Sequence, residues 1–277
     1  MPALDITRLP AACFRTPPAD AQWTQFDIAL VRTAGDARPG ARRLFALVES
    51  WWAPEYAAGR IPRWFFMRKP PDVRLRFLAT PQARPALDAL AAVLAREVAS
   101  GTLAAAAPGR YAPEETRFGG PAALDCAHAW FTLDSVLWRH FEARAAQDLR
   151  EPAAEIWLAA IFQDLFAAVG ARDGWPRLAR HVELSSPPAA ALLPGLPTLA
   201  ALAGEAAPDA ATRALAQAYR EGNRHFAAAL ARRALPPGCP AAEVASLTAF
   251  FTFNRHGFPG ERSRPLVASL LAAQNAS

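Results

Sequence analysis

Apolar and polar positions alternate in short segments of the first part of the chain, whereas later segments repeat their apolar positions at helical spacing. Alternation and short apolar runs predict β-strands, and the longer spacing predicts amphipathic helices. Pro70, Pro71 and Asp72 predict a hairpin-like connection between two of the strands. The predicted strands are Gln25–Arg32, Arg63–Met67 and Val73–Ala79, with helices at Arg42–Trp52 and Pro85–Ser100 and a loop or short strand at Leu103–Arg110.

After Gly119 and Gly120 the pattern becomes almost wholly helical. A Pro/Ala/Gly-rich segment at Pro187–Pro208 predicts a surface loop with one or two helical turns. The predicted helices are Ala122–Asp148, Ala153–Val169, Trp175–His181, Ala211–Ala234, Ala241–Asn254 and Pro265–Gln274. Strands gather in residues 20–120 and helices in 121–277, which predicts an α+β fold: an antiparallel sheet with flanking helices, then a mainly helical half. We expect residues 1–277 to form a single domain.

Composition fits a globular chain, with 52% hydrophobic and 20% charged residues among 277. No uncharged apolar run reaches the length of about 18 residues that a membrane-spanning helix needs, and no signal peptide is evident, so the expected location is cytoplasmic. Cys13, Cys126 and Cys239 are widely spaced, as free thiols in a reducing compartment are. No Cys or His spacing typical of zinc occurs, and no metal is predicted.

The formal net charge is +5, and Lys69 is the single lysine among 30 basic residues. Two interpretations remain open, a solvated arginine-rich surface and a basic groove for an acidic polymer. An acidic peptide fits better than a nucleic acid, because the arginines are spread along the chain and no nucleic-acid-binding motif occurs.

Arg74 and Arg76 would share one face of the strand Val73–Ala79, because side chains alternate with a period of two. Two neighbouring guanidinium groups repel each other unless an anion bridges them. They either form an internal ion pair with a glutamate or clamp a substrate carboxylate, amide oxygen or oxyanion. Spacing alone does not separate these alternatives.

The segment Tyr111–Gly120 (YAPEETRFGG) places Glu114 and Arg117 just before two glycines. A charged turn between a strand and a helix would explain this pattern. Alternatively, Glu114 and Arg117 flank a cleft with Tyr111 packed beside them, where a carboxylate next to an arginine serves as an anchor or a base.

Three further groups of polar residues lie in predicted helices. Asp134 and Ser135 lie within an apolar helix, where local or interhelical hydrogen bonds are the usual role. Asn254 and Arg255 end an aromatic run, as residues at a helix C-terminus often do. The histidines without a partner at meaningful spacing are His128, His140, His181 and His225.

Taken in order, four motifs resemble one known family. They are RLRF at residues 74–77, YAPEETRFGG at 111–120, FTLDS at 131–135 and Asn254-Arg255. This order resembles the C-terminal domain of lantibiotic dehydratases, which also occurs as a stand-alone thiopeptide-type bacteriocin biosynthesis protein. The resemblance implies the fold of the lanthipeptide dehydratase elimination domain and a ribosomally made precursor peptide with a leader as the partner.

The resemblance implies one of two activities. One branch of the family eliminates glutamate from glutamylated Ser or Thr and uses histidines. The position that corresponds to the histidine of the strand holds Asp72 or Val73 in this chain, and the one in the C-terminal helix holds Phe250. The other branch is a pyridine synthase, which joins two dehydroalanines by a formal [4+2] aza-cycloaddition and expels water and the leader. Elimination needs a base and an acid, which Phe250 cannot supply, so we favour cycloaddition.

On this hypothesis Arg76 and Arg117 would polarise backbone carbonyls, while Tyr111 and Glu114 would shuttle protons or fix the arginines. No cofactor is required, and other enzymes of the same pathway are further expected partners. Two alternatives remain: a split glutamate-eliminating lyase and a non-catalytic leader-binding module. The residues expected to bind substrate are Arg74, Asp134, Ser135, Ser246, Thr248, Phe250, Asn254 and Arg255.

Overall fold

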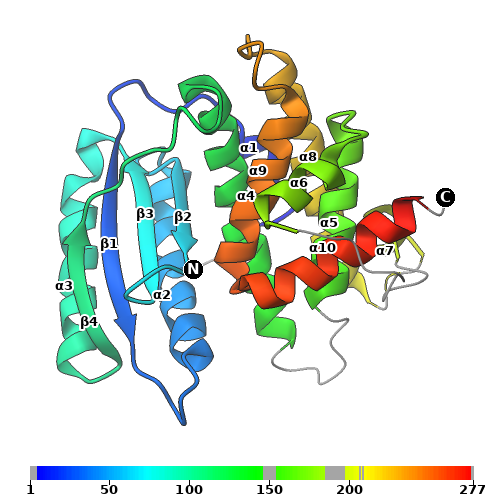
Figure 1. The fold of residues 1–277 in the computed structure, drawn as a ribbon. Coiled ribbons are helices and arrows are strands. Elements are labelled where there is room, and N and C mark those ends of the chain that lie inside the picture. The colour runs from blue at the N-terminus through cyan, green and yellow to red at the C-terminus, as the bar shows by residue number, and fades with distance from the viewer. Residues whose placement is uncertain (1–4, 146–153, 185–196, 206, 208, 276–277) are drawn as a thin grey trace.

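A four-stranded antiparallel sheet lies beside a group of helices (Figure 1). The computed structural model describes residues 5–145, 154–184, 197–205, 207 and 209–275. The strand order is β2-β3-β1-β4, and each neighbouring pair is antiparallel. The strands are β1 (Gln22–Leu30), β2 (Arg63–Met67), β3 (Val73–Ala79) and β4 (Leu103–Gly109). The predicted α+β class is therefore confirmed.

One face of the sheet is aromatic and packs against α2 (Arg38–Ala57). Phe66 of β2 stacks on Phe45 with ring centroids 3.9 Å apart, and Phe77 of β3 meets Trp51 edge-on at 5.3 Å. These side chains occupy every second strand position, as the period of two requires. The remaining positions point to the opposite face.

The opposite face carries the charged side chains of the strands. Gln25 and Asp27 of β1 lie opposite Arg76 and Arg74 of β3, and Phe65 of β2 flanks Arg76 on its other side. This register confirms that the two arginines share a face. Cross-strand neighbours have Cβ atoms only about 5 Å apart, so pairing alone brings an amide to Arg76 and a carboxylate to Arg74.

Helices cover the edge strand β2 and continue away from the sheet (Figure 1). The helix α4 (Pro121–Ala145) contacts β2 and α2 on one side and α8 and α9 on the other. A hydrogen bond of 2.9 Å from Trp130 Nε1 to Asn223 Oδ1 joins α4 to α8. The remaining helices are α1 (Leu9–Cys13), α3 (Arg84–Ala99), α5 (Ala154–Ala168), α6 (Gly174–His181), α7 (Leu199–Leu202), α8 (Ala210–Ala231), α9 (Ala241–His256) and α10 (Gly260–Asn275), with a 3₁₀ turn, η1, at Pro81–Ala83.

The structure adds elements that the pattern did not specify. The short helix α1 was not predicted, and β4 settles the choice between loop and strand for residues 103–109. Most of the predicted loop Pro187–Pro208 lies outside the described residues. In the part that is described, α7 forms one helical turn. Among the helices described, none is both long and apolar enough to cross a membrane.

Candidate functional site

Arg76 is the centre of the polar sheet face. Its side chain is 8% exposed, and its Nε donates a 2.8 Å hydrogen bond to Oε1 of Gln25. The guanidinium carbon lies 4.1 Å from the ring centroid of Tyr111 and 5.4 Å from that of Phe65, within the range of a cation–π contact. Burial lowers the pKa of Arg76, but an arginine remains protonated near neutral pH. The result is a desolvated, fixed positive charge.

Arg74 and Arg76 differ in their partners. Arg74 is half-buried, lies 3.8 Å from Oδ1 of Asp27 and donates from Nε to the carbonyl of Pro70 at 3.2 Å. Within the described part of the chain, Arg76 has no carboxylate oxygen within 4 Å. Arg74 therefore has the kind of internal ion pair considered from the sequence, but its partner is Asp27 and not a glutamate. Gln25 links the two because its amide nitrogen also donates to Asp27 Oδ1 at 2.8 Å.

Tyr111 joins Arg76 to a buried histidine that sequence spacing did not single out. The hydroxyl of Tyr111 and Nε2 of His128 on α4 are 2.6 Å apart. Burial raises the pKa of Tyr111, and the charge of Arg76 partly opposes this shift. Burial lowers the pKa of His128 well below its ordinary value, and the charges of Arg63 and Arg76 lower it further. Both groups are therefore neutral at pH 7. A proton passed from the phenol to the imidazole would leave two buried charges, so the pair can relay a proton only together with a bound group that gives one proton and takes another.

Arg117 lies on a turn that α9 supports. Its Nη1 is 3.2 Å from Oε2 of Glu114, and both side chains are partly exposed. The guanidinium carbon lies 5.3 Å from the ring centroid of Phe250 and 5.2 Å from that of Phe251. Gly119 has φ +77°, and a Cβ there would come 2.7 Å from Sγ of Cys239, so the turn needs glycine at this position.

Lys69 completes a cluster of four cations, and sequence analysis had counted it only as a charge. Its ammonium nitrogen lies 5.8 Å from the ring centroid of Phe251. Burial lowers the pKa of Lys69, the carboxylate of Glu114 opposes this, and three nearby arginines lower it further. Glu114 thus lies among an excess of positive charge. We call this group the cation cluster: Lys69, Arg74, Arg76 and Arg117.

The interior ion cluster of Asp134 and Arg255 lies behind the aromatic layer. Both side chains have no exposed surface, and Arg255 Nε donates to Asp134 Oδ2 at 2.9 Å. The guanidinium carbon of Arg255 lies 4.1 Å from the ring centroid of Phe131. Tyr219 and His256 also contact the carboxylate, each at 3.1 Å. This arrangement supports the aromatic wall of the site and does not line it.

The hydroxyl groups proposed to bind substrate are buried in their own helices. Ser246 donates to the carbonyl of Glu243 at 2.9 Å, and Thr248 to that of Val244 at 2.7 Å. Ser135 is also buried, and its Oγ has no hydrogen-bond partner among the described residues. The structure therefore does not bring these hydroxyls to the cation cluster.

Phe250 and Asn254 line a cavity of about 240 Å³ that also contains His181. The ring centroids of Phe250 and His181 are 5.8 Å apart, and Nε2 of His181 lies 3.0 Å from Oε1 of Glu243. Burial lowers the pKa of His181; Glu243 opposes this shift, and Arg117 adds to it. A neutral imidazole beside a carboxylate can accept a proton. His181 lies on α6, so counting positions along the sequence of α9 could not identify it.

The strand position that corresponds to a histidine in the eliminating branch, Asp72 or Val73, provides no free base. The carboxylate of Asp72 accepts a 2.8 Å hydrogen bond from the backbone N–H of Leu30 and pairs with Arg32, while Val73 is fully buried. In the described part of the chain, no group of three or more His, Cys, Asp or Glu side chains is arranged to hold a metal ion.

Two comparisons with known proteins bear on the family and the fold of this chain. The family model "Lantibiotic biosynthesis dehydratase C-term" matches residues 23–273. The chain therefore belongs to the family of lantibiotic dehydratase C-terminal domains.

The fold is similar to the crystal structure of the tRNA-dependent lantibiotic dehydratase MibB from Microbispora sp. 107891. The TM-score is 0.66 at 18% sequence identity, over 95% of this chain and 29% of MibB. The chain thus spans less than a third of the length of that protein. The search of curated proteins found no match.

Proposed function

We propose that this protein is a pyridine synthase of thiopeptide biosynthesis. Its substrate would be a linear, ribosomally made precursor peptide bearing azoles, two dehydroalanines and a leader. A formal [4+2] aza-cycloaddition would join the dehydroalanines, and loss of water and leader would close the macrocycle. We also propose a cytoplasmic location and contact with other enzymes of the pathway. The net charge of +5 would favour an acidic leader.

The environment of the Arg76 side chain is the observation that supports this proposal most directly. It is a buried cation with no carboxylate within 4 Å among the described residues, held by Gln25 and stacked on Tyr111. A fixed donor in a poorly solvated site polarises a neutral amide carbonyl strongly and needs no reorganisation during the reaction. One dehydroalanine amide must become a 2-azadiene, and a cation on its oxygen favours that tautomer.

The Tyr111–His128 pair suits the proton transfers of this reaction. The diene forms when an amide N–H loses its proton and the carbonyl oxygen gains one. Two neutral groups 2.6 Å apart can accept a proton at one atom and return it at another. We therefore assign proton movement to Tyr111, with His128 orienting it, and assign the fixing of Arg117 to Glu114.

Aromatic rings surround both arginines and would hold the two alkenes against each other. Phe65 lies beside Arg76, while Phe250 and Phe251 lie beneath Arg117. Cycloaddition depends mainly on holding the reacting groups in a productive geometry. Apolar walls supply that geometry without competing for the carbonyl groups.

Glutamate elimination is the second candidate, and the location of His181 favours it. The histidine register in α9 holds Phe250, but the imidazole of His181 lies against that ring and beside Glu243. It could remove the α-proton of a glutamylated residue, while Arg117 and Lys69 receive the departing carboxylate. This reaction would form a carbon–carbon double bond and release glutamate.

Incubation with defined peptides and mass spectrometry separates these candidates. Cycloaddition predicts that a bis-dehydroalanine peptide loses the mass of the leader plus water, and elimination predicts that only a glutamylated peptide loses glutamate. His181→Asn should leave cycloaddition intact and abolish elimination, whereas Tyr111→Phe should slow cycloaddition. Full cycloaddition by Arg117→Ala would refute the site assignment. Leader binding without turnover of either peptide would identify a non-catalytic binding module.

A further inference from the structure

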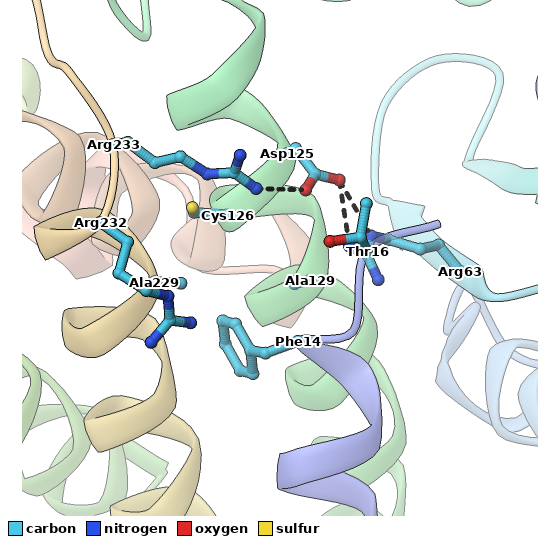
Figure 2. Close-up of a pocket in the computed structure, with 9 residues that line it drawn as sticks. All are labelled: Phe14, Thr16, Arg63, Asp125, Cys126, Ala129, Ala229, Arg232 and Arg233. Atoms are coloured by element: carbon cyan, nitrogen blue, oxygen red, sulfur yellow. Dashed lines mark hydrogen bonds and ion pairs between the residues drawn. The ribbon is translucent and has the colours of Figure 1, made fainter. Parts of the chain in front are cut away.

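A second cavity of about 260 Å³ lies where α1, β2, α4 and the end of α8 meet (Figure 2). Its polar lining is dominated by three guanidinium groups, those of Arg63, Arg232 and Arg233, and Asp125 supplies one carboxylate. Two positive charges are therefore left uncompensated within one small space. Such an excess attracts an anion, and because Arg232 and Arg233 are exposed the attraction weakens as the salt concentration rises.

The three arginines differ in how far they are already engaged. Arg63 is buried and saturated, because it donates to the carbonyls of Cys13 and Arg15 at 2.6 and 3.2 Å and to Asp125 at 3.0 Å. Arg233 lies 3.7 Å from the other oxygen of Asp125, which is too long for a strong hydrogen bond.

Arg232 is the least engaged of the three arginines. It forms no ion pair within the described part of the chain, and Figure 2 shows its guanidinium reaching into the cavity beside Phe14. Arg232 and Arg233 therefore retain donors for a ligand.

The remaining lining suits a short apolar stem that ends in an anion. The ring of Phe14 forms one wall and is held by His225 and Phe226 at centroid distances of 6.0 and 6.5 Å. Thr16 also lines the cavity and carries a hydroxyl group. The volume is below the range of about 300–1,000 Å³ that is usual for small-molecule sites. It is suited to a single side chain or a chain end.

The cavity lies close to the candidate site but is separate from it. Arg63 is two residues from Phe65 on the same face of β2, roughly 7 Å along the strand. His128 on α4 stacks on Phe65 with ring centroids 5.4 Å apart, and the charges of both Arg63 and Arg76 lower its pKa, so it is within electrostatic range of both regions. A peptide segment bound at the cation cluster could therefore place a residue a few positions away in this cavity.

We propose that this cavity binds a carboxylate group of a peptide, with Arg232 and Arg233 as its ligands. Arg63, held by Asp125, contributes a fixed charge behind them. Guanidinium groups match carboxylates in geometry as well as in charge. The carboxylate could be an acidic side chain or a C-terminus, which share this chemistry. A nucleic-acid phosphate fits less well, because binding the backbone requires a line of cations and the cavity already contains Asp125.

The Nε–Hε signals of arginine in ¹⁵N-labelled full-length protein provide the test. Arg232→Gln and Arg233→Gln assign the relevant signals by their disappearance. Titration with N-acetylglutamate N-methylamide should shift both signals saturably, and N-acetylglutamine N-methylamide should not. Each variant should weaken binding about tenfold or more, the value of a charge-assisted hydrogen bond. Tighter binding of N-acetylglycine would identify a chain terminus as the ligand, and preference for the glutamate derivative an acidic side chain.

Two further variants make the test independent of folding effects. Arg224→Gln, on the same helix but paired with Glu221 at 2.5 Å outside the cavity, should bind like the parent protein. Asp125→Asn removes the competing carboxylate and should tighten binding severalfold. The proposal is wrong if the glutamine derivative binds equally, if Arg232→Gln and Arg233→Gln bind normally, or if inorganic phosphate binds and neither carboxylate does.

Discussion

Replacing Asp134 by asparagine is expected to destabilise the protein strongly, because its carboxylate balances the buried charge of Arg255. Burial alone would raise the pKa of Asp134, but His256 and Arg255 more than offset this, and the net pKa is lowered. The carboxylate is therefore ionised at neutral pH. Asparagine keeps the shape and removes the charge, which leaves the guanidinium of Arg255 unpaired in the interior.

The expected size of this effect follows from the complete burial of the pair. Removing one partner of a buried ion pair costs about 3–5 kcal/mol. For a urea m-value of about 3 kcal/mol/M, the unfolding midpoint should fall by roughly 1–1.7 M at constant m. This is a large share of the 5–15 kcal/mol typical of total stability.

Urea titration followed by tryptophan fluorescence measures the shift, since the chain contains 8 tryptophans. Glu221→Gln is a matched control, because its pair with Arg224 is exposed and should be worth less than about 1 kcal/mol. Adding Arg255→Met to Asp134→Asn should recover part of the loss by removing the unpaired charge. If Asp134→Asn shifts the midpoint no further than Glu221→Gln does, the reasoning is refuted.

Three more outcomes are expected. The pKa of His128 is lowered by folding, so the unfolded state binds more protons below about pH 6.5, and stability should fall with decreasing pH by up to about 1.4 kcal/mol per unit from this residue. His128→Asn should flatten that slope in urea titrations at pH 5 to 7. Gly222→Ala should destabilise by about 1–3 kcal/mol, since its Cβ would overlap Leu133 across the α4–α8 contact, and a higher thermal midpoint would contradict this. Gly119→Ala should displace the turn that carries Arg117 and reduce turnover while most of the thermal stability remains, as calorimetry and peptide assays can check.

Much of the fold could be predicted from the sequence because its signals are local. The bounds of β2 and β3 were predicted residue for residue, since each is a short, buried, aromatic or branched segment between turn residues. By contrast, β4 reads LAAAAPG, a sequence of low strand propensity. Pairing with β1 makes it a strand, and such pairing has no signature within the segment itself.

The candidate site was only partly predictable because its partners lie far apart in the chain. His128 meets Tyr111 across 17 positions, and His181 meets Glu243 across 62. Residue spacing detects neighbours within one turn of helix or along one strand. The ordered motifs nevertheless pointed to Arg76, Arg117 and Tyr111. In the structure a chain of cation–ring and ring–ring contacts through buried phenylalanines connects those three residues.

The single lysine of this chain lies within the cation cluster, so the candidate site can be labelled selectively through its amine. Arginine supplies the other 29 basic side chains, so the primary amines available to an acylating or methylating reagent are Lys69 and the terminal amine. Burial lowers the pKa of Lys69, which increases the fraction of reactive free amine. Reductive methylation with ¹³C-formaldehyde should therefore place one side-chain isotope label at the candidate site. That label would report peptide binding directly, without any substitution in the chain.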